Sequence, residues 1–339
     1  MTNVAQHADR DLDGPTPTLH DLDAYRTELT GYCYRMLGSA VDAEDAVQET
    51  ITRAWRALDR FEGRSSLRTW LYRIASNVCF DHLRAAKRRK WTLGTGPRWT
   101  PGGDIPGPVD GPWIEPAPDA RVLSDSGDPA DLAEARESVR LALVAALQHL
   151  PARQRAALVL CDVLRWPATD AAELLDTTVA SVNSALQRAR ATLAERGLSP
   201  VDVAPQELHP DDRALLDRYV DAFERYDIDA LAELVHADAT QTMPPYELWM
   251  RGREHIAAWM TGPGAECAGS RLLPLRANGR PAFAQYRARP DGQGHDPWAL
   301  QVLEVADGSI VGFSFFLDTA RLFPLFGAPL HLPPRPAGT

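Results

Sequence analysis

Two neighbouring stretches of the chain carry opposite charge, and each favours a different kind of partner. Residues 64–90 hold eight cations and one anion, Asp81, for a net charge of +7. Such a block attracts phosphates by releasing their counterions, although a solvated helix face with a basic tail gives the same pattern. The cations are Arg64, Arg68, Arg73, Arg84, Lys87, Arg88, Arg89 and Lys90.

The stretch before this block is acidic. Its polar residues are Asp42, Glu44, Asp45, Gln48 and Glu49. Because carboxylates repel phosphates, this face favours a protein partner that presents Arg or Lys. A simpler interpretation is that acidic groups near a helix N-terminus offset the helix dipole.

Both stretches show the apolar period of an amphipathic helix. The first helix is expected over about 42–58, and a cap at Ser65 or Ser66 is expected to start the second. The stripe of the first is Ala43, Val47, Ile51, Ala54, Trp55 and Leu58. The stripe of the second is Leu67, Trp70, Leu71, Ile74, Ala75, Val78, Leu83 and Ala86.

Aromatic and amide groups near the basic helix suit an opened DNA strand. Phe61 and Trp70 supply area on which bases can stack, and the Asn77 amide can both donate and accept at a base edge. Core packing is the simpler role for Trp70, and a solvent-facing position is the simpler role for Asn77.

Residues 25–90 resemble region 2 of the extracytoplasmic-function (ECF) sigma factors of bacterial RNA polymerase, through YRMLGSAVDAEDAVQETITRAW and FEGRSSLRTWLYRIASNVCFDHLR. The resemblance implies a region 2 domain over 19–90. It implies that the acidic helix binds the clamp helices of the largest polymerase subunit through Asp45, Gln48, Glu49 and Arg53. It also implies that Phe61 and Asn77 read a single-stranded −10 element, while Arg64, Arg68, Arg73 and Arg84 hold its backbone.

The next forty residues, 91–130, read as a flexible linker. They hold eight Pro and seven Gly, a density that a packed helix or sheet does not tolerate. Trp91, Trp99 and Trp113 are unusual in a tether and suggest that it lies in a groove of a partner. In sigma factors the equivalent linker enters the polymerase channel; a plain disordered spacer is the alternative.

Residues 131–197 are expected to form four helices. One opens at Asp128-Pro129, others start at Pro151 and Pro167, and the last runs from about Val179 to Glu195 after a tight turn at 176–178. Through LPARQRAALVLCDVLRW and SVNSALQRARATL the segment resembles sigma region 4, a helix-turn-helix. The resemblance implies −35 element contacts from Asn183, Ser184, Gln187 and Arg188, with Arg190 close to the backbone.

The net charge also bears on how DNA is reached. The chain carries a net charge of −10 with a pI near 5.4, whereas a protein that binds DNA by itself is usually basic. We therefore expect weak binding to free duplex and recruitment to the promoter by the polymerase.

After a short linker at 198–209, residues 210–318 change to an α+β pattern with a curved antiparallel sheet. Strands are expected at 240–243, 271–275, 282–287, 298–305 and 309–317, the last two joined by an Asp307-Gly308 hairpin. The segment resembles the SnoaL-like domains, which are cone-shaped barrels, through YVDAFERYDIDALAELVHADATQTMPP and the terminal strand pair. One group of ECF sigma factors carries this appendage, where it modulates activity in cis.

The cone could hold a pocket or simply a packed core. Candidate pocket residues are Met243, Tyr246, Trp249, Trp259, Tyr286 and Trp298. His236, His255 and Asp238 are polar candidates for chemistry, but no convergent acid–base pair stands at a telling spacing. An enzyme is therefore not expected, and no cofactor is. The Pro-rich tail, 319–339, carries apolar residues that we expect to pack on the sigma domains or the cone.

Together these features predict a multidomain chain: two all-α sigma domains followed by an α+β SnoaL-like cone. The expected partners are core RNA polymerase and promoter DNA, with either a small-molecule ligand in the cone or intramolecular docking of the C-terminal domain. Four scattered cysteines without a C-x-x-C pair argue against a metal site. No apolar run reaches membrane-spanning length and no signal peptide opens the chain, so a cytoplasmic protein without membrane contact is expected. A helix-turn-helix regulator that acts without polymerase and an enzyme seated in the cone are the alternatives.

Overall fold

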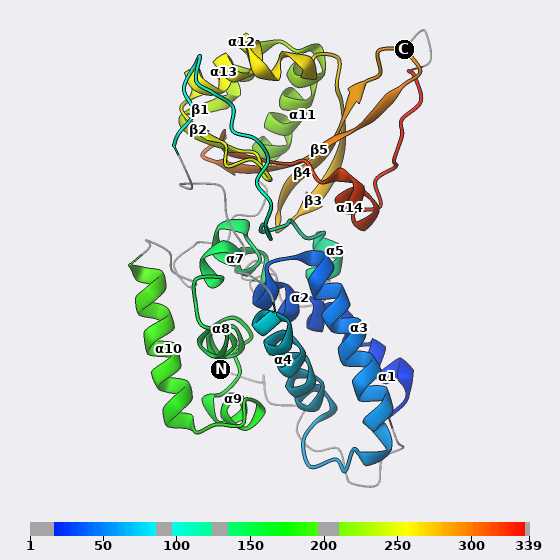
Figure 1. The fold of residues 1–339 in the computed structure, drawn as a ribbon, viewed down its shortest axis with the longest axis vertical. Helices are drawn as coiled ribbons and strands as arrows, with labels where there is room; N and C mark the ends of the chain where they lie inside the picture. Colours follow the sequence, from blue (N-terminus) through cyan, green and yellow to red (C-terminus); the bar gives the residue numbers. More distant parts are fainter. Residues whose placement is uncertain (1–16, 86–96, 124–134, 196–209, 336–339) are drawn as a thin grey trace.

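The computed structural model describes residues 17–85, 97–123, 135–195 and 210–335, and it places two helical bundles below an α+β domain (Figure 1). The basic run at residues 87–90, Trp91, the helix start at 128–129 and the linker at 198–209 lie outside the described residues. Within the described ranges no helix is both long and apolar enough to cross a membrane.

The first bundle consists of α1 (Leu19–Asp23), α2 (Arg26–Leu37), α3 (Ala40–Ala57), the short 3-10 turn η1 (Leu58–Arg60) and α4 (Leu67–Ala85). Gly38, with φ of 72°, ends α2, and the Ser39 hydroxyl accepts from the Asp42 N–H to start α3. The Ser66 hydroxyl accepts from the Thr69 N–H at 3.1 Å, which confirms the expected cap of α4. Tight turns thus stack α2, α3 and α4 against one another.

The second bundle consists of α7 (Leu141–Leu147), α8 (Ala152–Leu158), the π-helical turn η2 (Val159–Val163), α9 (Ala168–Leu174) and α10 (Val179–Ala194). Pro151 and Pro167 occupy the N-cap positions of α8 and α9, as their fixed φ allows. Asp176 takes a left-handed conformation, with φ of 50°, between α9 and α10. The predicted helix-turn-helix is therefore present.

The C-terminal domain packs helices on one face of a six-stranded sheet of order β2-β1-β6-β5-β4-β3. Its helical segments are α11 (Pro210–Arg225), α12 (Ile228–Leu234), α13 (Arg253–Thr261) and η3 (Pro263–Cys267). The strands are β1 (Val235–Thr242), β2 (Trp249–Arg251), β3 (Arg271–Ala277), β4 (Arg280–Ala288), β5 (His295–Ala306) and β6 (Ser309–Phe316).

Two details of this sheet test the expected topology. Asp307 and Gly308 both have positive φ, 49° and 68°, and they join β5 to β6 as the predicted hairpin. The expectation of a purely antiparallel sheet is wrong, because β1 pairs with β6 in parallel. Between them the polypeptide forms β2, α13, η3 and then β3, β4 and β5, and this long connection lets β6 return beside β1 in the same direction.

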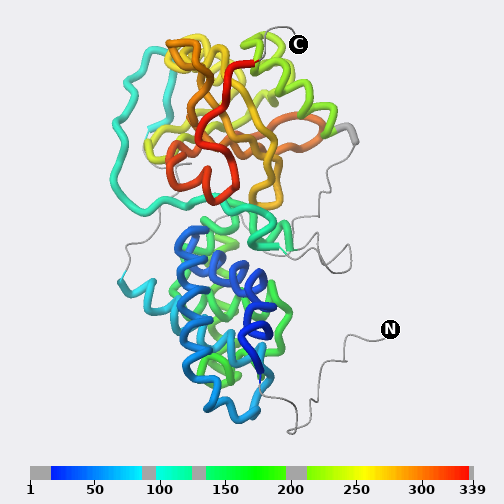
Figure 2. The backbone as a smooth tube through the Cα atoms, turned by 90° about the vertical axis from the view of Figure 1, so that its right-hand side faces the viewer, coloured from blue at the N-terminus to red at the C-terminus, as the bar shows by residue number. Residues whose placement is uncertain are grey.

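The prediction of a flexible linker over 91–130 is wrong for residues 97–123, which wrap around the C-terminal domain as an irregular strap (Figure 2). The Trp99 N–H donates to the Trp249 carbonyl at 2.9 Å, and the Trp99 ring meets Trp259 edge-on at 5.1 Å. Trp99 and Trp113 are both buried. Pro and Gly exclude a regular helix, but single backbone bonds and aromatic anchors still hold the segment. The surface that Trp99 meets therefore belongs to the same chain.

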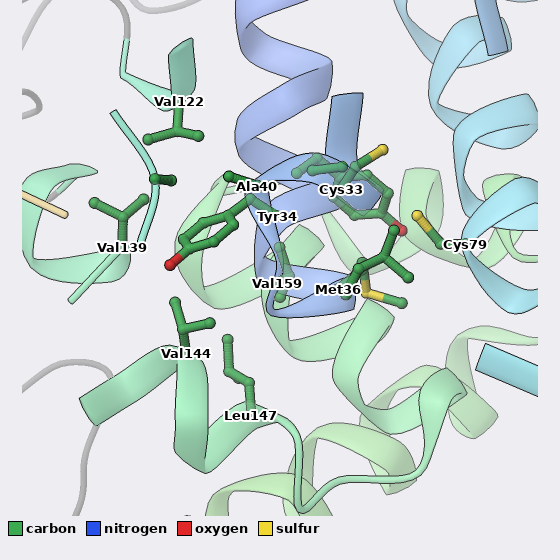
Figure 3. Close-up of a cluster of buried hydrophobic side chains, with 14 of the residues drawn as sticks. Cys33, Tyr34, Met36, Ala40, Cys79, Val122, Val139, Val144, Leu147 and Val159 are labelled. Atoms are coloured by element: carbon green, nitrogen blue, oxygen red, sulfur yellow. The ribbon is translucent and has the colours of Figure 1, made fainter. Parts of the chain in front are cut away.

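From Ile114 onward, through the short helix α5 (Asp119–Val122), the strap joins a hydrophobic core that also contains both bundles. Tyr34 of α2 lies between Val139 and Val144 of the second bundle, while Val122 approaches from the strap (Figure 3). Cys33 and Cys79 belong to this core as free, buried thiols. The two bundles and the strap thus share one packed interior.

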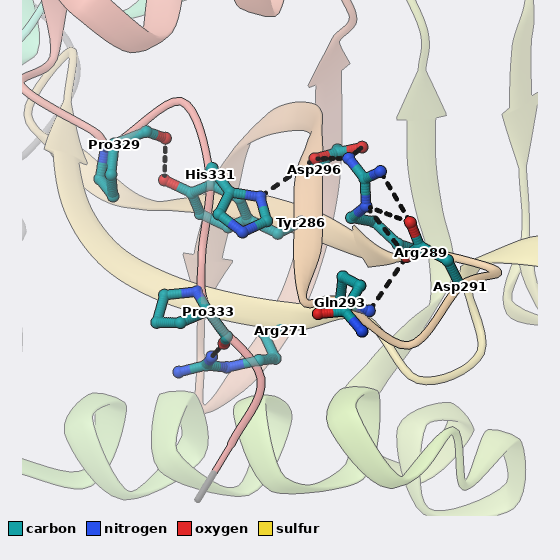
Figure 4. A network of polar contacts seen from close by, with 9 residues as sticks. All are labelled: Arg271, Tyr286, Arg289, Asp291, Gln293, Asp296, Pro329, His331 and Pro333. Atoms are coloured by element: carbon teal, nitrogen blue, oxygen red, sulfur yellow. Dashed lines mark hydrogen bonds and ion pairs between the residues drawn. The ribbon is translucent and has the colours of Figure 1, made fainter.

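The tail docks on the C-terminal domain, as predicted. Helix α14 (Thr319–Leu325) places Phe323 5.1 Å from the Tyr286 ring, on the sheet face opposite α11. Beyond it, the Tyr286 hydroxyl donates to the Pro329 carbonyl, and His331 lies 3.3 Å from Asp296 (Figure 4). These contacts cover the second face of the sheet.

The turn between β3 and β4 connects all of these parts. The buried Asn278 amide donates to the Tyr34 hydroxyl at 2.7 Å and to the Val139 carbonyl at 2.5 Å, and it accepts from the Ala117 N–H at 2.9 Å. The Asn278 N–H donates to the Ala117 carbonyl at 3.1 Å. One side chain therefore bonds to the first bundle, the second bundle and the strap.

We expect Asn278→Gly to destabilise the docked arrangement while leaving the backbone turn intact. Glycine accepts the φ of 56°, so the loss reports the side-chain hydrogen bonds, each of which contributes roughly 1 kcal/mol. Denaturant unfolding should show a free energy lower by about 2–3 kcal/mol.

The matched control for this variant is Asp307→Gly. Asp307 has a similar φ of 49° in the β5–β6 turn, but its side chain is exposed, so the substitution changes backbone freedom without breaking a buried contact. Equal losses of unfolding free energy in the two variants would contradict the role assigned to the Asn278 amide.

Candidate functional site

Helix α3 presents an acidic outer face with two of its predicted contact residues pointing to solvent. Asp45 and Gln48 are exposed. Glu49 and Arg53 pair with each other at 2.5 Å and reach across to α4, where Arg53 lies 3.5 Å from Asp81 and Glu49 lies 3.5 Å from His82. The four predicted residues therefore share one side of the bundle, with one pair also bridging its helices.

Trp55 is the residue of this face that sequence analysis misplaced. It was assigned to the apolar stripe, but 53% of its surface is exposed. Trp55 lies seven residues, or about two helical turns, after Gln48, so both side chains lie on the same face of the helix. This spacing is the sequence feature that could have predicted the exposure of Trp55. An exposed Trp beside an acidic face adds apolar area of the kind that protein interfaces bury.

A polar cavity of about 250 Å³ adjoins the start of this face. Glu44 on its wall binds Arg121 of α5, with 2.7 Å between the guanidinium and the carboxylate. The strap comes this close because α2 carries Gly31, where a Cβ would stand 2.6 Å from the Val122 carbonyl oxygen. The cavity is lined by Arg26, Thr27, Thr30, Glu44, Asp45, Gln48 and Arg121.

Helix α4 leaves part of the predicted strand-binding set open. Asn77 is exposed, and Arg64 in the preceding loop and Arg84 of α4 are the most accessible arginines of the set, paired with Glu62 and Asp81. The Phe61 ring lies 5.0 Å from the half-buried Trp70 ring. Trp70 therefore packs against Phe61, while the stacking of a base on this pair stays a prediction.

Arg68 and Arg73 of the same set are engaged within the chain. The Arg68 guanidinium donates to Glu28 at 2.7 Å and lies 4.8 Å from the Trp166 ring centre. Burial alone would lower the pKa of Arg68, but the hydrogen bond and charge of Glu28 carry its net pKa above the usual value. Arg73 donates to the Glu173 carbonyl at 3.1 Å. Both arginines therefore face the second bundle.

The last helix, α10, exposes the predicted DNA-reading residues. Asn183, Ser184, Gln187 and Arg188 all point to solvent, and the Thr178 hydroxyl caps the helix by accepting from the Ser181 N–H. Arg190 differs, because two of its guanidinium nitrogens bind the buried Asp162 carboxylate, at 2.9 and 2.6 Å. Its structural role is to hold α10 against η2.

The residues predicted to line a pocket in the cone do not line the cavity that the structure has there. Tyr219, Phe223 and Phe313 fill the cone, and the small cavity beside them, about 20 Å³, has room for about one water molecule. Tyr286 lies on the opposite sheet face, and Trp298 stacks under Arg287 at 4.0 Å. The pocket candidates absent from the cavity wall are Met243, Tyr246, Trp249, Trp259, Tyr286 and Trp298.

The polar candidates of the cone do not form a catalytic pair. His236 and Asp238 are exposed on β1, and Asp238 pairs with Arg251 at 3.3 Å. His255 sits on α13, beside Gly252. In the ranges that the structure describes, no group of three or more His, Cys, Asp or Glu side chains is arranged to hold a metal ion.

Comparison with known proteins matches each part of the chain to a family model. Residues 22–89 match sigma-70 region 2, residues 140–193 match sigma-70 region 4, and residues 216–313 match the SnoaL-like domain. The ECF RNA polymerase sigma factor SigG of Mycobacterium tuberculosis H37Rv is 46% identical over 310 residues, which are 91% of this chain and 82% of SigG.

A second relative from the same organism, the ECF RNA polymerase sigma factor SigJ, is 31% identical over 249 residues, which are 71% of this chain and 72% of SigJ. The crystal structure of SigJ covers 92% of this chain and all of its own, with a TM-score of 0.58 and 23% identity. That likeness supports the same order of helical bundles and α+β domain.

We expect Gly31→Ala to displace α5 from the first bundle. The new methyl group would meet the Val122 carbonyl oxygen, although alanine by itself favours helix α2 by about 1 kcal/mol. Hydrogen exchange of residues 117–123 should then become about tenfold faster. Gly107→Ala, in open space on the strap, is the matched control. Equal protection of α5 in both variants would show that the close approach does not hold it.

Proposed function

Because this chain belongs to the ECF family of RNA polymerase sigma factors, we propose that it binds core polymerase through α3 and recognises promoter DNA through α4 and α10. The chain is a transcription initiation factor and not an enzyme. The observation that carries the assignment of surfaces is the opposite charge of two adjacent, exposed helix faces in the part that matches sigma region 2. We place its action in the cytoplasm, with the polymerase.

The polymerase contact is assigned to the outer face of α3. Asp45 and Gln48 offer exposed acceptors to cationic groups of the clamp, and Glu49 and Arg53 extend the polar face toward α4. Trp55 supplies a large apolar contact on the same line of the helix. Charge complementarity of this kind steers association, while Trp55, once covered by the partner, would contribute most of the affinity.

The −10 contact is assigned to the η1–α4 loop and to α4. Phe61 can stack with a base, Asn77 can bond to a base edge, and Arg64 and Arg84 can hold phosphates in place of their weak surface pairs. Arg68 and Arg73 complete this surface once their present partners withdraw. An opened strand rather than duplex suits a site that offers one half-buried ring and one exposed amide.

The −35 contact is assigned to α10, with Asn183, Ser184, Gln187 and Arg188 as the reading residues. Asn and Gln favour adenine in the major groove, and Arg favours guanine. Arg190 remains a residue that positions the helix, since Asp162 already holds it.

The C-terminal domain is assigned a modulating role in cis. Asn278 supports this role through its bonds to both bundles. Arg280 of β4 adds an ion pair with Glu137, at 2.8 Å, in which both side chains are buried. A domain attached by such contacts can change how the sigma regions present themselves, without a ligand in the cone.

Asp45→Arg should abolish productive binding to core polymerase. The substitution replaces an acceptor with a cation that repels the basic clamp surface, and we expect affinity to fall by about a hundredfold. Run-off transcription with core polymerase and a pull-down measure the effect. Asp217→Arg, at an exposed position of α11, is the matched control. Wild-type affinity in Asp45→Arg would refute the clamp assignment, and absence of run-off product with the wild-type chain on any genomic promoter library would refute the function.

Asn77→Ala should lower open-complex formation more than closed-complex binding. Its amide acts only when a base has left the duplex, so its loss should reduce melting by about tenfold while duplex recruitment changes little. Permanganate footprinting reports the first quantity and gel mobility the second. Equal losses in both assays would argue against base capture by Asn77.

A further inference from the structure

We propose that Trp166 and Glu173 of the second bundle act as an intramolecular substitute for the DNA strand on α4, with Trp166 in the position of a base and Glu173 in that of a phosphate. The inference rests on the assignment of α4 as the −10 surface. It means that the free chain keeps part of its own strand-binding site occupied until the second bundle moves away.

Trp166 has the contacts that a stacked base would have. The Arg68 guanidinium lies over its ring at 4.8 Å, and the Tyr72 ring meets it at 5.0 Å. Only 7% of Trp166 is exposed, so the indole fills the site. Arginine and aromatic planes are the groups on which nucleic-acid bases stack.

Glu173 has the contacts that a phosphate would have. Its carboxylate lies 3.3 Å from the Arg73 guanidinium, and the carbonyl of the same residue accepts from that group at 3.1 Å. Both oxygen atoms accept from the same terminal nitrogen of Arg73, so the carboxylate takes the place of a phosphate through one nitrogen of the guanidinium. Trp166 and Glu173 thus occupy neighbouring arginines of the same predicted set.

The contact between α4 and the second bundle leaves two buried polar groups unsatisfied, which favours its opening. The Trp166 indole N–H and the Arg73 Nε are buried, and neither has a hydrogen-bond partner among the described residues. Both groups would regain water when the bundles separate, so opening is opposed less strongly than the buried area alone suggests. Glu173 itself is largely exposed, which keeps its ion pair weak.

The occupied and open parts of α4 are separate. Arg68 and Arg73 face the second bundle, whereas Asn77, Arg64 and Arg84 remain accessible. Helix α3 lies on the far side of α4 from α8 and α9 (Figure 1). The polymerase-binding face is therefore open in the same state in which the strand-binding face is half covered.

The test compares full-length variants for binding to a fluorescent single-stranded DNA pool of about 12 random nucleotides, measured by anisotropy. Glu173→Gln keeps the size of the side chain and removes its charge, and we expect affinity to rise about twofold to fivefold. Glu233→Gln removes the same charge from an exposed position of α12 and controls for net charge. Trp166→Leu keeps an apolar group but removes the stacked ring, and it should raise affinity further, with far-UV circular dichroism to check the fold.

The outcomes separate this proposal from the assigned function. If the affinity for the DNA pool rises more in Glu173→Gln than in Glu233→Gln, the result supports the proposal that these side chains occupy the place of the DNA strand. Equal affinities in these two variants overturn it, whatever Trp166→Leu shows. If neither the wild type nor any variant binds the pool, with or without core polymerase, the −10 assignment itself fails.

Discussion

The arrangement of the whole chain depends on the buried polar turn between β3 and β4. Asn278 is completely buried and holds partners from three parts of the sequence. Buried amides must be satisfied, because an unpaired group in the interior is expensive. Gly279, with φ of 72°, continues the turn where a Cβ would stand 2.9 Å from the Arg136 carbonyl oxygen. The turn therefore ties the bundles and the C-terminal domain to this relative position.

Charged groups reinforce that position. Glu137 binds both Arg140 and Arg280, and Glu304 of β5 joins the same two arginines. Such a network contributes little net stability, since desolvation offsets the attraction, but removing one member leaves a buried charge without compensation. The network thus determines which docked geometry forms more than it adds to the stability of that geometry. The strap and the tail also fix the arrangement, because each is held along a defined path over the sheet by hydrogen bonds.

Sequence alone was sufficient where function depends on local pattern. The period of α3 and α4, the Ser66 cap, the Asp307-Gly308 hairpin and the exposed residues of α10 all follow from neighbours within a few positions. Composition did not predict the ordered path of the strap. A high Pro and Gly content excludes regular helices and strands, but it does not indicate which surface the tryptophans of the strap contact. The aromatic residues of the cone failed for a similar reason. Residue type does not reveal which sheet face holds Tyr286, or that Tyr219 and Phe313 close the interior.

The same distinction explains the arginines of α4. Their number indicates nucleic acid, but only tertiary contact shows that Arg68 and Arg73 already have acceptors. In the closed arrangement the second bundle covers Arg68 and Arg73, and in the open arrangement it does not. A partner that binds α3 equally well in both arrangements cannot shift the equilibrium between them, however tightly it binds. A shift needs a contact that differs between the two. The strap offers a candidate, because Arg121 binds Glu44 beside the proposed polymerase-binding face while Ala117 binds Asn278 at the domain junction. We therefore expect a cation from the polymerase that replaced Arg121 at Glu44 to act on the domain junction through residues 118–120 of the strap.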